Sequence, residues 1–549
     1  MVMKRARGFQ VYLGVMCAAC ALLASADVFA EQNCTSIEPV PFSLQDSLLR
    51  ARLGAESAPT SFKFDENTQD GTSRRMFSRF RLRFDYKQYN ASSERSTEIK
   101  GESDDTSHCG TPQDVMPRLM IRAEADVFSG VVVGDVSPQI PARAHTGTQL
   151  DRQAWDGLGA ALDPRELSVG YTTPIGLLKA GLQTSQFGLG VLANSGDEDG
   201  EKLLFDRQQG GDRVWRLLFV TKPFSSQGNA LADVYTALGG DLVWRDDFAS
   251  WLDGDRAYQV IGSIFYQTEE AFAGVYAARR RQYDADGSRL DVTAFDGSFK
   301  LPFFSEHPTL DAHLAVEGVV LAGETDRVYP YDESDTMGVL GRGMAIEFHG
   351  YHNKTMLGTH ILAGGASGDG NPDDGTLYRL RFDPNYNVGL ILFDQFLPAV
   401  TRAYHQRAIA PEEQGEPPRG AENLINDGAI ENAYYLNPRL SLGRENEGAL
   451  LGLGALVAWS PQPWFDPYST FAQGGEPVGI QGNTTELNDL GWEVDASLQY
   501  RASLLSGRLF MAVRGEAGVF VPGKAFRSVV DEQLSERYSL FRGRIDFEW

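Results

Sequence analysis

The chain has 549 residues, of which 42% are hydrophobic, and its 50 Lys and Arg against 74 Asp and Glu give a formal net charge of −24. This acidic balance argues against a nucleic-acid partner, because nucleic-acid binding depends on basic surface. No stretch beyond the N-terminal segment approaches the roughly 20 apolar residues that a membrane-spanning helix needs. An integral membrane form would therefore have to be a β-barrel.

The first 30 residues have the pattern of a secretory signal peptide. Three basic residues between 4 and 7 precede an apolar run at 11–23, and Ala30 closes a small-residue cleavage site. Cys17 and Cys20 lack a Leu-led lipobox, so we expect them to leave with the signal rather than to mark a lipoprotein. Removing this segment takes away a net charge of +2 and leaves −26.

The mature chain would begin with an N-terminal extension at 31–72, followed by a β-barrel at 73–549. It keeps two cysteines, Cys34 and Cys109. We expect a disulfide between them rather than a metal site, because secreted proteins are oxidised and His108 is not at ligand spacing.

The first two expected strands, 76–86 and 118–127, alternate strictly between apolar and charged residues. In the first, Arg79, Arg81 and Arg83 share one face, opposite three large apolar residues. In the second, Arg118 and Arg122 share a face in the same way. We expect these arginines to point into a wet lumen and the apolar faces to meet lipid.

The same period of two recurs through the middle of the chain. It is clear at 310–317 and 344–349, and further strands are expected in the following ranges: 164–172, 177–184, 213–221, 256–267, 271–282, 288–302, 354–364, 376–382, 433–442 and 448–459.

The alternation is clearest near the C-terminus, at 492–501, 508–516 and 541–549. The last strand places Phe541, Ile545 and Trp549 opposite Arg542 and Arg544. The tally is near seventeen strands, and single-chain bacterial barrels have even numbers. The sequence therefore predicts an all-β fold: a single transmembrane antiparallel barrel of 18 strands, with 16 as the alternative, and long extracellular loops.

One segment departs from this period. From Val388 to Ile409 apolar residues recur at helical spacing, with Pro398 as a possible kink, inside a long connection at 383–430. A helix cannot form part of the barrel wall in lipid. We favour a helix on a loop outside the membrane over one that folds into the pore.

Motifs for chemistry are weak. The chain has no Gly-x-Ser-x-Gly elbow, and His349 and His352 would lie on opposite faces of a strand. The glycine- and acid-rich run at 364–375 lacks EF-hand spacing, so we interpret it as a surface loop. Arg279 to Arg281 could contact lipopolysaccharide phosphates, another phosphate or solvent. We expect no enzyme, no catalytic residue, no metal and no cofactor.

The arginines on the first two and last two strands form the strongest functional pattern. Barrel closure makes these strands neighbours, so the arginines would form one sector of the lumen: Arg79, Arg81, Arg83, Arg118, Arg122, Arg508, Arg514, Arg542 and Arg544. Such a sector would attract anions through its field. The alternative is structural pairing with inward carboxylates.

Three short motifs resemble the alginate-export type of outer-membrane porin, in particular its divergent relatives: Arg-Phe-Arg-Leu-Arg-Phe at 79–84, the segment Gln186 to Asn194 with Asp197 and Asp206-Arg207 after it, and Tyr378 to Pro384 before Val388. The resemblance covers most of the mature chain. It implies an 18-stranded monomeric barrel in the cell outer membrane, with an arginine-lined constriction that exports an anionic exopolysaccharide.

We therefore expect an outer-membrane channel for an anionic solute, with export of an acidic exopolysaccharide as the first interpretation. A general diffusion porin and a surface adhesion barrel are the alternatives. The expected partners are outer-membrane lipid and lipopolysaccharide, an anionic polysaccharide or small anions, and the barrel-assembly machinery, which would bind the C-terminal strand.

Overall fold

The computed structural model describes part of the chain in detail. Its described residues are 77–92, 118–127, 130–137, 163–173, 175–196, 204–205, 211–225, 230–268, 270–304, 307–327, 336–371, 374–401, 423, 426, 428–443, 448–466, 469–470, 473–474, 476–479, 488–504, 509–526 and 537–548. All of them belong to one compact unit, Leu48–Trp549. Within these residues, no helix is long and apolar enough to cross a membrane.

In the part of the chain that the structure describes, nineteen strands form one sheet. They are β1 (Phe77–Ser92), β2 (Arg118–Val127), β3 (Gly130–Ser137), β4 (Asp163–Thr173), β5 (Gly176–Thr184), β6 (Arg213–Thr221), β7 (Val234–Arg245), β8 (Arg256–Gln267), β9 (Phe272–Tyr283), β10 (Arg289–Phe303), β11 (Leu310–Thr325), β12 (Met337–His352), β13 (Leu357–Ala366), β14 (Thr376–Leu377), β15 (Ala433–Gly443), β16 (Gly448–Trp459), β17 (Asp489–Leu504), β18 (Leu509–Pro522) and β19 (Arg537–Glu548).

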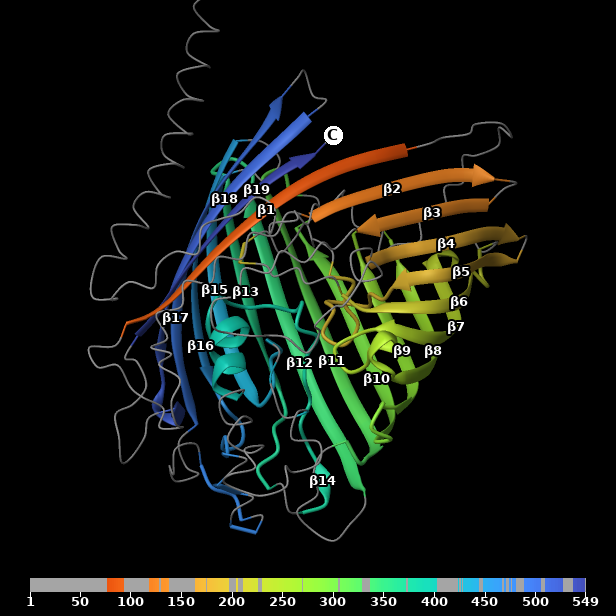
Figure 1. Ribbon diagram of the computed structural model, residues 1–549. Helices are drawn as coiled ribbons and strands as arrows, with labels where there is room; N and C mark the ends of the chain where they lie inside the picture. The colour runs from red at the N-terminus through yellow and green to blue at the C-terminus, as the bar shows by residue number, and fades with distance from the viewer. Residues whose placement is uncertain are drawn as a thin grey trace, which may run out of the picture. The chain divides into compact units, whose positions relative to one another are not determined.

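The sheet closes on itself. Each strand pairs antiparallel with the next along the chain, and β1 pairs with both β2 and β19. Only β14 stands apart, because its two residues pair in parallel with β12 while β13 pairs with β15. The other eighteen described strands form the ring, which is the number expected from the sequence. Figure 1 shows the long strands β10 to β13 and β15 to β18 running side by side.

The predicted alternation holds along these strands. In β15 and β16 exposed and buried residues alternate, so that Leu440 and Leu453 are 51% and 59% exposed while Tyr435 and Leu456 are almost fully buried. Large apolar residues are exposed on each strand of the ring from β4 to β19, with Val169, Leu238 and Phe295 as further examples. A continuous apolar outer face of this kind fits lipid rather than water.

The shortest and the longest connections of the ring lie after different strands. The links after β2, β4, β8, β12, β15 and β17 are short, whereas those after β1, β3, β5, β13 and β16 span many residues. Antiparallel pairing places successive links at opposite rims. The long links therefore share one rim, which in bacterial barrels is the extracellular one.

Three expectations from the sequence need correction. The strand expected at 376–382 is not part of the ring, because only Thr376–Leu377 pairs as β14 and Arg381 forms an isolated bridge with Glu431. Strands β3 and β7 were missed, because Gly130–Ser137 is a nearly continuous apolar run and Val234–Arg245 contains Gly239-Gly240. Neither pattern alternates clearly.

Among the described residues, short helices lie only in the connections between strands. They are η1 (Ala230–Asp233), η2 (Trp251–Asp253), η3 (Leu392–Phe396) and η7 (Lys524–Phe526). The π-helical η3 continues as an α-helix to residue 401, so the predicted helix is confirmed over 392–401. The wide π turn comes directly before Pro398, whose ring would crowd a regular preceding turn.

Candidate functional site in the lumen

The described parts of two long connections fold onto the inner face of the ring. The first infolded connection joins β5 to β6 and covers 185–212, and the second joins β13 to β15 and covers 367–432. The largest buried apolar cluster contains residues of both, packed against inward residues of β11 to β13 and β15 to β19. The helix at 392–401 thus lies against the inner wall, which supports the alternative of a helix that folds into the pore.

Glu317 on β11 holds the start of the first infolded connection. Its fully buried carboxylate accepts hydrogen bonds from the amides of Leu189, Gly190 (3.1 Å) and Val191 (2.9 Å). Gly188 has φ +52°, and a Cβ there would come within 2.2 Å of the Glu317 carboxylate. Only glycine lets the backbone approach an anion this closely. The motif that suggested a family resemblance therefore has a local structural role.

Glu493 on β17 holds the second infolded connection in the same way. Its carboxylate, also fully buried, accepts from the amides of Leu390, Ile391 (2.9 Å) and Leu392 (2.8 Å). These amides lie at the start of the helix, where backbone donors have no partner within the helix and favour an anion. A carboxylate on the barrel wall thus fixes where the helix begins.

The first infolded connection reaches a second part of the wall. The amide of Phe205 donates to Glu516 on β18 at 2.9 Å, and Arg439 on β15 donates to the carbonyl of Leu204 at 2.8 Å. On β16, a Cβ at Gly452 would lie 2.3 Å from the Leu204 side chain. The connection therefore extends from β11 to β16 and β18 across the interior of the ring.

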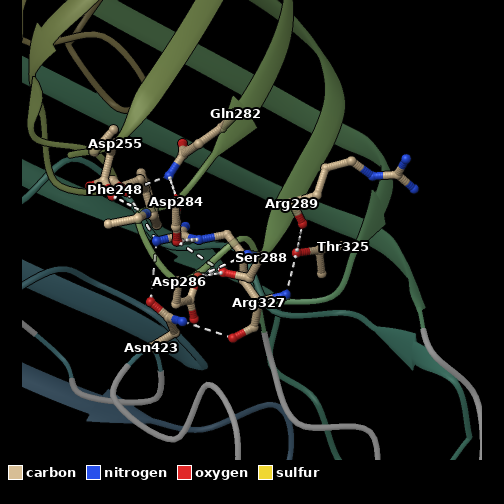
Figure 2. Close-up of polar contacts among 12 residues, drawn as sticks. Phe248, Asp255, Gln282, Asp284, Asp286, Ser288, Arg289, Thr325, Arg327 and Asn423 are labelled. Carbon is tan, nitrogen blue, oxygen red and sulfur yellow. Dashed lines mark hydrogen bonds and ion pairs between the residues drawn. The ribbon is translucent and has the colours of Figure 1, made fainter.

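The second infolded connection is also tied to the rim with the long links. Arg327, just after β11, donates to the Phe248 carbonyl at 3.0 Å and to the side chain of Asn423 at 3.2 Å, and it pairs with Asp284. Asn423 donates back to the Arg327 carbonyl at 2.7 Å. Figure 2 shows these groups converging from four separate segments. Arg327 thus joins three rim connections to the infolded one.

Further arginines gather beside Phe248. Arg280 on β9 and Arg381 lie over its ring, 6.0 and 5.7 Å from the centroid. Arg280 pairs with Asp246, while Arg381 and Arg379 pair with Glu431 through their Nε atoms at 3.4 and 3.2 Å. Sequence reasoning missed this cluster, because its members come from segments far apart in the chain.

Two aspartates adjoin this cluster, the buried Asp383 and the partly buried Asp212. Burial raises the pKa of Asp212 well above its usual range, and the charges of Asp383, Asp246 and Asp247 raise it further. Burial likewise raises the pKa of Asp383, with Asp247 and Asp246 adding to the effect. Both groups therefore favour the protonated, neutral form more than an ordinary aspartate does.

Of the nine arginines in the predicted sector, the side chains of three are described. Arg542 and Arg544 on β19 are buried, and Arg542 pairs with Glu516 at 2.6 Å. Arg514 on β18 donates to Gln499 at 2.8 Å. These contacts favour structural pairing for Arg542.

The remaining members of the sector have no described side chain: Arg79, Arg81, Arg83, Arg118, Arg122 and Arg508. The backbone register pairs Arg83 with Asp546 and Arg79 with Arg122, so β1, β2 and β19 are neighbours as expected. The expected disulfide between Cys34 and Cys109 lies outside the described residues.

Other motifs from the sequence have simple structural roles. Arg279 and Arg281 lie on the outer face, more than half exposed, and pair with Asp291, whereas Arg280 points inward. In the acid-rich run, Asp369 accepts from the amide of Asn371 at 3.1 Å, as in a turn.

No family model and no curated protein matches the sequence. Three crystal structures to which the chain is similar are OccK2 of Pseudomonas aeruginosa in complex with glucuronate (10% identity, TM-score 0.43), OccAB1 of Acinetobacter baumannii (12%, 0.45) and the outer membrane protein opdK of P. aeruginosa (10%, 0.42). Each match covers 86% of this chain and 96%, 96% and 99% of the other. None is an alginate exporter.

Proposed function

We propose that the chain is a passive channel of the bacterial outer membrane that admits small solutes. The observation that carries the proposal is the occupied interior: two long connections cover the inner wall and contact each other through the amide of Asp383 and the carbonyl of Val191, 2.7 Å apart. A closed ring with an apolar outer face supports insertion in a membrane. An infolded segment narrows the path along which solutes diffuse.

This proposal replaces polymer export as the first interpretation. An exported polysaccharide chain needs a continuous wide path, whereas the helix at 392–401 and the segment at 187–191 are packed against the wall by buried contacts. We also propose that the channel selects for anions. The positive charges of the arginines near Phe248 support this selectivity, and the pairing of these arginines with Asp246 and Glu431 reduces it.

Planar-bilayer recording tests the proposal. The wild-type protein should form channels. In vesicle-swelling assays, these channels should exclude, by size, oligosaccharides that wide porins admit. The double variant Glu317→Gln/Glu493→Gln weakens both anchors and should increase conductance or current fluctuation. Glu324→Gln, the same change at an exposed residue of β11, is the matched control.

Two results would contradict the proposal. A folded wild-type barrel without measurable conductance would favour the adhesion alternative. Equal passage of small sugars and long acidic polymers would restore export as the leading function.

A further inference from the structure

Three histidines from neighbouring strands form a row on the inner wall. The register pairs His313 on β11 with His349 on β12, and His349 with His360 on β13. Directly opposed residues of paired strands share a face. His349 is 7% exposed, and the other two are partly exposed. Each is the fourth residue from the strand end at a short link, so the row is near the rim opposite the arginine cluster.

The imidazole nitrogens of this row approach one another closely. Nδ1 of His349 and Nδ1 of His360 are 2.8 Å apart, with their rings nearly perpendicular. Two nitrogens that each lie about 2.0–2.1 Å from one ion are about 2.9–3.4 Å apart for angles between octahedral and tetrahedral. The observed separation is therefore close to that of two ligands of one metal.

A carboxylate orients the central histidine. Oε2 of Glu347, two residues before it on the same face, lies 3.2 Å from Nε2 of His349. A carboxylate that accepts from one ring nitrogen leaves the other nitrogen unprotonated and more basic, which is the arrangement found behind metal-ligating histidines. Nδ1 of His349 is thus prepared to bind a cation.

We propose that His349 and His360 form the core of a binding site for a borderline divalent transition metal: Zn²⁺, Ni²⁺ or Cu²⁺. Imidazole is a preferred ligand of these ions. The ring of His313 stacks on that of His349 with centroids 4.6 Å apart, so it packs beside the two ligand histidines. Among the described residues, no group of three or more His, Cys, Asp or Glu could hold a metal ion. The site is accordingly a two-histidine core completed by water.

The surroundings set the expected affinity. Arg439 on β15 is the register partner of His360, and its positive charge opposes a bound cation. Glu347 has the opposite effect. We therefore expect binding in the micromolar range rather than the much tighter binding of structural zinc sites.

The test measures metal binding directly, independently of channel activity. Untagged, chelator-treated protein in detergent is titrated with Zn²⁺ and Ni²⁺ by calorimetry. The wild type should bind about one equivalent, and His349→Asn/His360→Gln should weaken binding at least tenfold. His313→Gln should weaken it less. The matched control is His307→Gln/His352→Gln, which changes two histidines outside the row and should bind as the wild type does.

Loss of binding in the control double variant, or the absence of stoichiometric binding in the wild type, would overturn the proposal. In the latter case the close nitrogens would share a proton in a simple hydrogen bond. If the double variant does not fold, electron paramagnetic resonance of the Cu²⁺-loaded wild type tests the site independently. Hyperfine coupling to imidazole nitrogens is expected, and an oxygen-only signal would refute the site.

Discussion

The amide of Asp383 donates to the carbonyl of Val191 at 2.7 Å, which joins the two infolded connections inside the ring. Each connection is separately held by a buried wall glutamate, Glu317 for the first and Glu493 for the second. Because the two anchors are linked through this contact, loosening one connection should affect the other.

Gly188→Ala should loosen the first infolded connection. Gly188 has φ +52°, and its new Cβ would lie 2.2 Å from the Glu317 carboxylate, so both backbone strain and a clash oppose the native contact. We expect a loss of stability on the order of 1–3 kcal/mol, measured by denaturant unfolding in detergent. Gly240→Ala on β7, where a Cβ meets nothing within 4 Å, is the control. Equal effects of the two substitutions would contradict this account of the anchor.

Acidification should stabilise the packing of the second infolded connection. The pKa of Asp383 is raised by burial and by Asp247 and Asp246, so its protonated form is favoured in the folded state. The stabilisation that the Asp383 carboxyl gives to the folded state is fully present below the ordinary aspartate pKa. It is lost as pH rises through the raised pKa of the folded state. Asp383→Asn should therefore increase stability at neutral pH and flatten its decline with pH. A variant with an unchanged pH profile would rule out this residue as the cause.

The arginines of β1 should influence ion selectivity if they belong to the lumen sector. Replacing Arg79, Arg81 and Arg83 with glutamine removes three positive charges and should make the channel less anion-selective, as measured by reversal potential across a salt gradient. Charges in a confined path are screened less than surface charges, so the change should persist at moderate salt. Arg279→Gln/Arg281→Gln, on the outer face, should leave the reversal potential unchanged. An unchanged potential in the triple variant would favour structural pairing.

A charge on the outer face should impair membrane insertion. Val260 on β8 is 61% exposed. Val260→Arg should reduce the free energy of folding into lipid vesicles by about 2–4 kcal/mol if the residue lies near the middle of the bilayer. Val260→Ala keeps the site apolar and should cost far less. Efficient folding of the arginine variant would show that this face does not meet hydrocarbon.

The period of two was enough to predict most of the wall of the barrel, although not strands β3 and β7. In β15, β17 and β19 each side chain's face follows from its parity, because neighbouring residues of a strand point to opposite sides. The outward set, such as Trp492 and Ile545, and the inward set, such as Glu493 and Arg542, therefore follow from the amino-acid order alone. The helix at 392–401 was likewise visible in its own periodicity.

Only the tertiary structure decided what lies against that wall. Parity shows that Glu317 and Glu493 face inward, but their partners at 189–191 and 390–392 are more than a hundred residues away in the chain. The histidine row has the same origin: His349-x-x-His352 was the pair visible in the sequence, whereas His313 and His360 adjoin His349 through strand register. Local pattern fixes the face of a residue because it depends on backbone geometry alone. Register and the folding of long connections depend on contacts between distant segments, which no local pattern contains.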